Sequence, residues 1–407
     1  MENKKILLLI LILCLLLRIV WIFVFSPIEL TDDPKAYDSI AKGLVQGEGY
    51  HEEGKRAFRP PGYPYFLAAL YSIFGAHPLP VKLVQAVLGV FTCLIIFLLG
   101  KRFANERTGL WAAGFFAVYP QFIRYPGGLY AETLFIVLLF LAILILFVFT
   151  EKPTYSRSIL AGILMGFAAL TREVAFLMLF PIAFWMFFFI KNSVIRKTYL
   201  IKLSTFFIFF ILTICPWTLR NYFVFHEFVL FSTSGGFNFY IGNNPEATGE
   251  YDSDLDTKIK WPMSIKDKSQ EELLALEIEA SKSGYKQGMN FIINNPTKFL
   301  KLSLKKLFLF WRPPYYNLKF PKNIKETPFR IAWLINYSIL MLLAIPGIVM
   351  SIKMFGSKSY LFHFLLLSVT GLHMLVYTAT RYRLPLIPIL MIFAALTIDT
   401  AWTHIRQ

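Results

Sequence analysis

The sequence predicts an all-α polytopic membrane protein. Of its 407 residues, 56% are hydrophobic and 17% are aromatic, which is far more apolar than an ordinary soluble domain. The apolar residues fall in long runs, most of them close to the ~20 residues that a helix needs to cross a bilayer. Basic residues gather in the short turns between these runs, as is typical of cytoplasmic loops. Together these features predict about ten transmembrane helices, with interfacial helices in the outer loops.

The net charge of +16 does not indicate nucleic-acid binding. Basic turns are explained by the positive-inside bias and by attraction to anionic lipid headgroups. Cys14, Cys93 and Cys215 lie in apolar runs and show neither a disulfide pattern nor a metal-binding spacing. The first apolar run, 6–25, is long enough to span and has no small-residue cleavage site after it, so we expect a retained helix.

The predicted spans alternate across the membrane from a cytoplasmic N-terminus, because Lys4 and Lys5 precede the first of them. They lie at about 6–25, 80–100, 108–123, 133–150, 158–171, 174–190, 203–219, 331–351, 360–377 and 384–402. We expect three parts: an N-terminal transmembrane module at 1–219 with an outer loop at 26–79, a large extracytoplasmic loop at 220–330, and C-terminal transmembrane helices at 331–407.

The first outer loop is rich in carboxylates and carries helix signals. Seven carboxylates lie between residues 26 and 64. Asp33 followed by Pro34 predicts a helix start with an acidic N-cap, and Gly47 predicts the helix end. A further apolar stretch, 62–75, is too short to span and predicts a second interfacial helix.

The large outer loop has a different composition in each part. Gly, Asn, Asp and Pro dominate 234–256, which predicts irregular loop. Residues 270–293 predict a helix, and 297–311 predict an amphipathic helix that carries several lysines.

Several arginines break the positive-inside pattern, because they fall on the predicted outer face. They are Arg124, Arg172, Arg220, Arg381 and Arg383. A single outer arginine can simply reach lipid headgroups. Arginine's planar fork also suits phosphate binding, and several arginines on one face beside carboxylates favour that function.

Polar side chains from five predicted outer segments share this face. They are Asp32, Asp33 and Arg59 in the first loop, Glu132 before the fourth span, Arg172 with Glu173, then Arg220, Asn221, Asn243 and Asn244, and finally Arg381, Tyr382 and Arg383. Such a set suits a reaction in which a carboxylate activates a hydroxyl while cations stabilise a phosphate leaving group. A lipid-linked phosphate could enter such a site from the bilayer.

Structural roles stay open for each of these residues. Asp33 can act only as an N-cap, and Glu132 can act as a favourable charge near a helix N-terminus. Arg172 and Glu173 can pair with each other, and Asn243-Asn244-Pro245 can form a turn.

Short motifs are spread along nearly the whole chain. They are Asp33-x-x-x-Tyr37, Gly47-x-Gly49-Tyr50, Arg59-Pro60-Pro61-Gly62-Tyr63-Pro64, Tyr130-Ala131-Glu132-Thr133-Leu134-Phe135, Thr171-Arg172-Glu173, Pro216-Trp217-Thr218-Leu219-Arg220-Asn221-Tyr222, Gly242-Asn243-Asn244-Pro245 and Arg381-Tyr382-Arg383-Leu384-Pro385. Their order and outer placement resemble the GT-C membrane glycosyltransferases, and in particular the branch related to protein O-mannosyltransferases and lipid A aminoarabinose transferases.

The resemblance implies a GT-C fold in the cell membrane, with an active site on the extracytoplasmic face. It implies inverting transfer of a sugar from a polyprenyl-phosphate donor to an envelope glycan, lipid or protein. The family's first-loop acidic residue falls on Asp33, with Asp32 before it rather than after it, so the base stays open between these two residues. Glu132 occupies the second acidic position. Some relatives bind a divalent metal and others do not, so the metal stays open.

The resemblance also implies a set of residues for the donor phosphate and the substrates. It comprises Arg59, Tyr63, Arg172, Glu173, Arg220, Asn243, Asn244, Arg381, Tyr382 and Arg383. Some relatives carry a large C-terminal soluble domain, and we expect no such acceptor domain here.

Other functions stay open from the sequence. One is a flippase or transporter of lipid-linked saccharides, which would favour charges near the bilayer midplane and internal repeats. The predicted spans are nearly free of midspan charge, and no repeat is evident. A structural envelope subunit and a glycan polymerase or ligase are the remaining alternatives.

Overall fold

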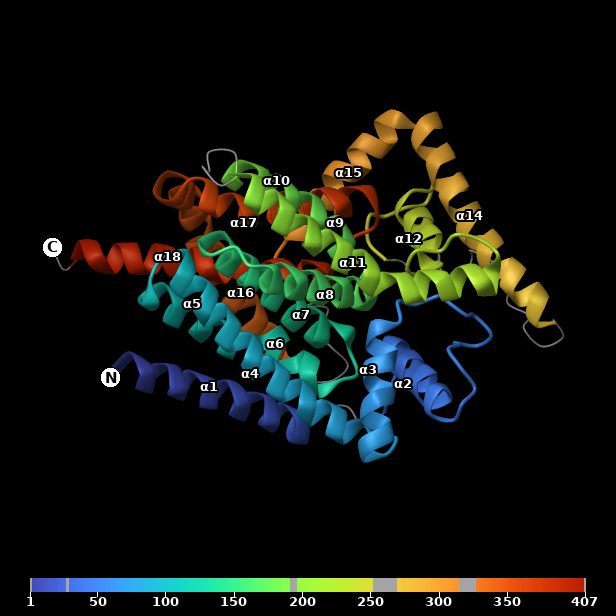
Figure 1. Cartoon of the computed structure of the whole chain (residues 1–407), viewed down its shortest axis with the longest axis horizontal. Coiled ribbons are helices and arrows are strands. Elements are labelled where there is room, and N and C mark those ends of the chain that lie inside the picture. The colour runs from blue at the N-terminus through green and yellow to red at the C-terminus, as the bar shows by residue number, and fades with distance from the viewer. Residues whose placement is uncertain (1, 27–28, 191–195, 252–268, 315–326, 406–407) are drawn as a thin grey trace.

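The structure of the protein is a computed structural model that describes residues 2–26, 29–190, 196–251, 269–314 and 327–405. Helices joined by short turns make up most of these ranges, which confirms the all-α fold class. Figure 1 shows both termini at one end of an elongated bundle, and α2, α3, α12 and α14 at the other end. The predicted outer loops therefore meet far from the termini.

Six described segments are long and apolar enough to cross a bilayer, so this is a multi-pass membrane protein. They are α1 with η1 (Glu2–Val20, Trp21–Phe25), α4 (Pro78–Phe103), α7 (Ala131–Glu151), α11 (Arg196–Phe225), α16 (Thr327–Phe355) and η4 with α18 (Thr380–Leu386, Ile387–Ile405). Each coincides with a predicted span. The count of about ten spans stays a prediction.

The other four predicted spans coincide with shorter helices. They are α5 (Glu106–Val118), α8 (Tyr155–Thr171), α9 with α10 (Val174–Leu177, Leu179–Ile190) and α17 (Ser357–Leu375). The predicted span 108–123 is interrupted at Tyr119, because the proline that follows disfavours a helical conformation there. Pro120 begins the separate helix α6 (Pro120–Arg124), and η2 (Tyr125–Gly127) follows it.

The helices α7 and α18 form the centre of the bundle. Both are apolar on all sides and mostly buried, as expected of helices surrounded by other helices. Helix α7 packs against α4 and α8, while α18 packs against α5 and α16. Glu132 lies in the first turn of α7, so this buried helix fixes the position of its carboxylate.

The first outer loop folds into α2 (Asp32–Val45) and α3 (Gly62–Phe74), as predicted. Tyr37 of α2 packs edge-on against Tyr63 of α3, with ring centroids 5.0 Å apart. Gly47 adopts a positive φ of 82° just after α2, a conformation that favours glycine and ends the helix. The predicted N-cap is wrong: Thr31 occupies the cap position, and Asp33 lies inside the first turn.

The large outer loop contributes α12 (Ser234–Gly242), α14 (Gln270–Asn294) and α15 (Pro296–Trp311). The two helices predicted at 270–293 and 297–311 are confirmed. The prediction of irregular loop at 234–256 is wrong for Ser234–Gly242, which form α12. Residues 252–256 lie outside the described ranges. Gly236 allows α12 to lie close against α14, because a Cβ there would lie 1.9 Å from the Ser281 carbonyl oxygen of α14. The glycines that suggested loop allow close helix packing.

Candidate active site

Asp33 is held between two arginines from distant parts of the chain. Its Oδ1 accepts a hydrogen bond from Arg59 Nη1 at 2.6 Å, and its Oδ2 accepts one from Arg381 Nη1 at 2.5 Å. Arg59 lies just before α3, while Arg381 lies in η4, at the start of the last candidate membrane-spanning segment. The Asp33 side chain is 19% exposed. The carboxylate therefore joins the first outer loop to the C-terminal helices.

These ion pairs set the protonation state of Asp33. Burial alone would raise the pKa of its carboxyl group, but the guanidinium groups of Arg381 and Arg59 hold that pKa well below its usual range. Arg172 acts in the same direction. Asp33 is consequently an anion at physiological pH.

Arg59 has further partners that the sequence did not predict. Its Nε donates to Glu52 Oε2 at 2.9 Å, and its guanidinium carbon lies 5.2 Å from the centre of the Tyr37 ring. Burial opposes the charge of Arg59, but Tyr37, Glu52 and Asp33 raise its pKa. Glu52 was one of seven similar carboxylates in its loop, and no local signal separated it from the others.

Glu132 and Arg172 form a second ion pair next to the first. Arg172 Nη2 donates to Glu132 Oε1, and the Glu132 side chain is only 6% exposed. Arg172 follows α8, so the packing of α7 against α8 brings the two residues together. Burial raises the pKa of the Tyr37 hydroxyl. The cations of the two pairs, Arg172 and Arg59, lower this pKa, and the anions, Asp33 and Glu132, raise it.

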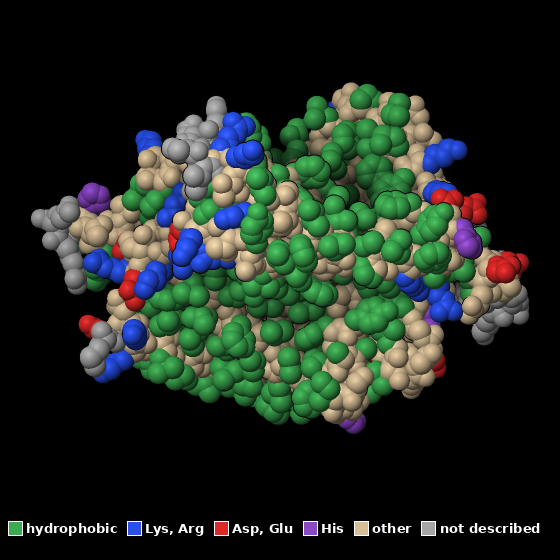
Figure 2. Space-filling model, in the orientation of Figure 1, with side chains coloured by type: hydrophobic (Ala, Val, Ile, Leu, Met, Phe, Trp, Pro, Cys, Tyr) green, Lys and Arg blue, Asp and Glu red, His purple; other side chains and the backbone are tan. Residues whose placement is uncertain are grey.

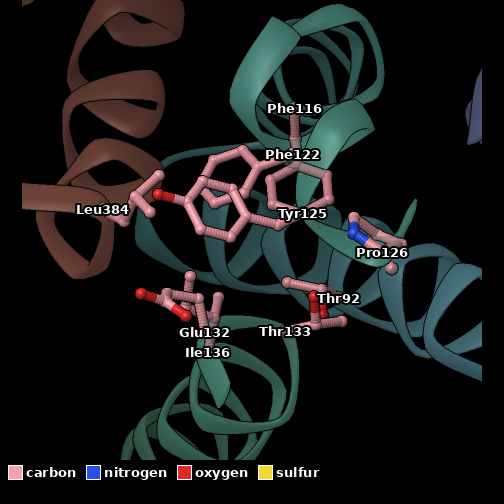
Figure 3. Close-up of a pocket in the computed structure, with 10 residues that line it drawn as sticks. Thr92, Phe116, Phe122, Tyr125, Pro126, Glu132, Thr133, Ile136 and Leu384 are labelled. Carbon is pink, nitrogen blue, oxygen red and sulfur yellow. The ribbon is translucent and has the colours of Figure 1, made fainter. Parts of the chain in front are cut away.

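Glu132 also borders a small cavity of about 10 Å³, roughly the space for one water molecule. Its Oε2 has no hydrogen-bond partner in the described structure. Figure 3 shows Glu132 and Tyr125 on opposite sides of this cavity, with Phe116 and Phe122 behind Tyr125. One carboxylate oxygen of Glu132 is thus occupied by Arg172 while the other faces an enclosed space.

Glu173 does not pair with Arg172, although the two are neighbours in sequence. Burial raises the pKa of Glu173, and the Ser232 hydroxyl and Arg172 only partly oppose this. Its Oε1 has no hydrogen-bond partner among the described residues. The structural alternative of a local Arg172–Glu173 pair is therefore replaced by the Arg172–Glu132 pair.

Arg220 makes its hydrogen bonds mainly to backbone carbonyls of the loop that precedes Arg59. Its Nη1 donates to the Arg56 carbonyl at 2.8 Å, and its guanidinium carbon lies 4.7 Å from the Trp217 ring centre. Its Nη2 donates to the Tyr50 carbonyl at 3.4 Å. Arg220 thus holds the loop that carries Arg59.

The remaining predicted site residues make contacts outside the two ion pairs. Asp32 is exposed, and the Tyr63 hydroxyl donates to Gln85 at 2.8 Å. The Tyr382 hydroxyl lies 2.5 Å from that of Tyr377. Buried Arg383 donates to the carbonyls of Phe310 and Arg312.

Asn243 and Asn244 bond mainly to backbone. Asn243 donates to the carbonyls of Phe239 and Leu375 and accepts a bond from Lys306. Asn244 donates to two α12 carbonyls and accepts from the Glu246 amide, as a turn residue does.

A large apolar cavity is lined by close chain neighbours of the paired residues, namely Pro61, Leu134 and Thr171. Its volume is about 830 Å³, and helices α3, α7, α8 and α11 form its walls. Its lining is mainly apolar and includes Tyr65, Leu138, Phe167, Leu212, Trp217 and Arg220. Leu212 and Phe167 are about half exposed, so this cavity borders the lipid-facing surface of the helices.

The cavity meets the charged cluster where α3 touches α8. A Cβ on Gly62 would lie 2.7 Å from Thr171 Oγ1, so only glycine allows this approach. Gly62 and Thr171 both line the cavity. Arg172 directly follows Thr171, and Arg59 lies three residues before Gly62. The apolar cavity and the arginines are therefore adjacent along two separate chain segments.

The charged cluster does not fit a divalent metal ion. Within the described ranges, no group of three or more His, Cys, Asp or Glu side chains is placed to hold a metal. Both oxygens of Asp33 and one oxygen of Glu132 already accept bonds from arginines. A divalent cation here would face three guanidinium groups, which would repel it.

Comparison with known proteins identifies the type of fold. Residues 58–217 match the family model described as dolichyl-phosphate-mannose-protein mannosyltransferase. No curated protein sequence matches the chain. The apo oligosaccharyltransferase of Archaeoglobus fulgidus superposes with a TM-score of 0.62 and 14% identity, over 99% of this chain and 51% of that one.

Two further structures are similar. AglB from the same organism, in complex with an inhibitory peptide and a dolichol-phosphate, has a TM-score of 0.60 and 17% identity, over 98% of this chain and 51% of that one. ArnT from Cupriavidus metallidurans, bound to undecaprenyl phosphate, has a TM-score of 0.45 and 11% identity, over 97% of this chain and 77% of that one.

The chain spans about half the length of the Archaeoglobus enzyme. It has the GT-C fold, and the resemblance to GT-C membrane glycosyltransferases predicted from its sequence is confirmed by this fold and by the mannosyltransferase family model over residues 58–217.

Proposed function

We propose that the protein is an inverting glycosyltransferase, which moves a sugar from a polyprenyl-phosphate donor to an acceptor outside the cytoplasm. The observation that carries the proposal is the position of Asp33. Its carboxylate is bound by Arg59 and Arg381, and Arg59 lies two residues before Pro61, which lines the apolar cavity of about 830 Å³. A hydroxyl-activating anion, phosphate-binding cations and a space for a lipid chain are thus adjacent.

The apolar cavity suits the polyprenyl chain of the donor. Its volume falls within the range of ligand-binding pockets, and its walls are mainly hydrocarbon. The related AglB structure was determined with a dolichol-phosphate, which supports a lipid phosphate as ligand for this fold. With the chain in the cavity, the donor phosphate would lie toward Arg172 and Arg59, the arginines that flank the contact between Thr171 and Gly62.

The proposed reaction is a single displacement at the anomeric carbon. The acceptor oxygen forms a bond to C1 of the sugar as the bond between C1 and the phosphate oxygen breaks. The bonding electrons leave with the polyprenyl phosphate, whose negative charge the arginines stabilise. Asp33 accepts the proton of the attacking hydroxyl, with its neighbour Asp32 as the alternative base.

The arginines link donor binding to the basicity of Asp33. Without donor, Arg381 and Arg59 hold the pKa of Asp33 well below its usual range, although burial opposes them. A phosphate that takes up hydrogen bonds from these arginines would draw their charge away from Asp33. The pKa of Asp33 would then rise, and the carboxylate would become a better base only when the donor is present. Glu132, which accepts a hydrogen bond from Arg172, would hold the Arg172 guanidinium group in place to bind the same phosphate.

We assign the site to the extracytoplasmic face of the cell membrane. The end of the bundle that carries both termini also carries basic turns, with Arg102, Lys101 and Lys358 among them, and positive loops favour the cytoplasm. The ion pairs of Asp33 lie toward the opposite end, with α2 and α3 (Figure 1).

A transfer assay in liposomes tests the proposal. The purified chain is supplied with polyprenyl-phosphate sugars and with envelope extracts, and released polyprenyl phosphate is measured with glycosylated product. Asp33→Asn should lower turnover by about 10²- to 10⁴-fold, as expected for a general base. Exposed Asp32→Asn should stay within a few-fold of wild type. Full activity in both variants would remove the assignment of either aspartate as base.

The same liposomes separate transfer from transport. A flippase would move the donor across the bilayer without releasing polyprenyl phosphate, and that result would exclude a transferase. Mass spectrometry of envelope glycans from cells with and without the protein then identifies the acceptor as a glycan, a lipid or a protein. A donor with a preassembled oligosaccharide as the only active substrate would indicate a polymerase or ligase.

A further inference from the structure

Glu277 is a buried carboxylate outside the two ion pairs of the candidate active site. It lies in the N-terminal half of α14, far along the chain from the first outer loop, and is 2% exposed. Its Oε2 accepts the backbone amide of Arg56 at 2.7 Å, and its Oε1 accepts the amide of Ala57 at 3.0 Å. The Thr233 hydroxyl donates to the same Oε1 at 2.6 Å. Two consecutive amides of the loop are thus bound by one side chain.

The opposite side of this short segment is also held. Arg220 donates to the Arg56 carbonyl at 2.8 Å, and the Thr233 amide donates to the Ala57 carbonyl at 2.8 Å. The Tyr50 hydroxyl donates to the Arg59 carbonyl at 2.8 Å. Residues 56–59 are therefore bound along both edges, although they form neither helix nor strand. We refer to residues 56–59 as the clamped segment.

The clamped segment ends at Arg59, which donates to Asp33. We propose that Glu277 is a positioning residue, which holds the clamped segment so that the Arg59 guanidinium stays on Asp33. This inference rests on the proposed transferase function, because it concerns the same site. A carboxylate suits the task, since an ionised acceptor binds amide donors more strongly than a neutral oxygen does. Burial raises the pKa of Glu277, and the hydrogen bonds from Thr233, Arg56 and Ala57 oppose that rise by favouring the charged form.

Simple attachment of α14 to the bundle is the alternative role for Glu277. Helix α14 has other attachments, because it packs along α12 and Lys282 of α14 forms an ion pair with Glu227 at 2.7 Å. Loss of Glu277 should therefore leave α14 in place. The clamped segment should respond more strongly, because the amides of Arg56 and Ala57 would lose their acceptor or bind a weaker one.

The matched variants are Glu277→Gln, which keeps the size of the side chain, and Glu279→Gln, which alters an exposed carboxylate on the same helix. In hydrogen–deuterium exchange, Glu277→Gln should speed exchange in peptides that cover residues 55–60, while Glu279→Gln should not. Thr233→Val removes one of the three bonds without removing the charge and should give a smaller change of the same kind. Unchanged exchange in Glu277→Gln would overturn the clamp.

A double-mutant cycle then tests whether Glu277 acts through Arg59. In the wild-type background, Glu277→Gln should lower kcat about 10²-fold, as expected for a misplaced reacting group. In an Arg59→Gln background, the same substitution should change the residual rate by less than about threefold, because groups that act as a unit are not additive. Equal losses in both backgrounds would overturn the proposal. Absence of transfer in the wild type would overturn the proposed function alone, and exchange would still decide the clamp.

Discussion

The ion pairs of Asp33 lead to a pH prediction at the scale of one residue. Burial opposes ionisation, but Arg381 and Arg59 hold the pKa of Asp33 well below its usual range. In Arg381→Gln one cation is lost, so this pKa should rise. As the pH is lowered, the activity of the variant should therefore begin to fall at a higher pH than the activity of the wild type does. Values of kcat/KM from pH 4.5 to 8 check this, because they report the pKa of the enzyme without bound donor.

Arg124→Gln is the control for that experiment, because Arg124 is exposed and stacks on Phe329. Its acid limb should match the wild type, and an unchanged acid limb in Arg381→Gln would contradict the role given to Arg381. The same pKa shift stabilises the fold. Because the pKa of Asp33 is lower in the folded state, this stabilisation is present above the unfolded pKa of about 3.9 and is lost as pH falls below it.

The pair of Glu132 and Arg172 predicts an effect on stability. Arg172→Gln would leave a carboxylate that is 6% exposed without its cation. Breaking a buried pair in this way costs about 3 kcal/mol, so the melting temperature in detergent should fall clearly. Adding Glu132→Gln should recover part of the loss. Arg102→Gln is the control, since it breaks an exposed pair with Glu151, and such pairs contribute about 0.5 kcal/mol. Equal losses in Arg172→Gln and Arg102→Gln would contradict this prediction.

Residue types and outer placement predicted a polar set that includes Asp33, Glu132 and the arginines, and the family resemblance selected Asp33 and Glu132 among the carboxylates. Neither predicted which of these residues form pairs. Arg172 could have paired with its neighbour Glu173, yet it pairs with Glu132, because the packing of α7 and α8 decides the distance. Arg381 and Arg383 are two residues apart in η4 and face different surroundings. A sequence does not indicate which of two such arginines faces the site.

At the scale of elements, the helices with strong periodicity and clear ends could be predicted. Helices α2, α3, α14 and α15 lie where the apolar patterns and Gly47 indicate. Helix α12 could not be predicted, because its glycines indicate loop in isolation and serve contact with α14 in the fold. The contact between Gly62 and Thr171 was equally hidden, since it depends on how α3 meets α8.

The apolar cavity between these elements predicts a chain-length effect. Leu212 of α11 lines the cavity, and Leu212→Trp should fill part of it. The KM for a long polyprenyl-phosphate donor should rise at least tenfold, which corresponds to about 1.4 kcal/mol of lost binding, while a short-chain donor should be little affected. Ile211→Trp is the control, because Ile211 is 58% exposed and does not line the cavity. An equal effect on both donors would contradict a role in binding the lipid chain.

At the scale of the whole molecule, charge is distributed unevenly between its two ends. Figure 2 shows a broad hydrophobic belt across the middle, and many lysine and arginine side chains over the end that carries both termini. Arg102 and Lys358 meet at that end, where the Lys358 ammonium donates to the Arg102 carbonyl at 2.5 Å. Two of the turns predicted to be cytoplasmic, those that carry Arg102 and Lys358, therefore meet on one side of the belt, and their contact could not be predicted without the fold.

This distribution predicts the orientation of the protein in the membrane. Glu53 is exposed in the first outer loop, and Lys101 is exposed at the end with the termini. In intact cells, an impermeant maleimide should label Glu53→Cys and should label Lys101→Cys only after permeabilisation. The unmodified chain is the control, because Cys14 and Cys93 are buried and Cys215 lies within α11. Labelling of Lys101→Cys in intact cells would place Asp33 in the cytoplasm and would require an acceptor there.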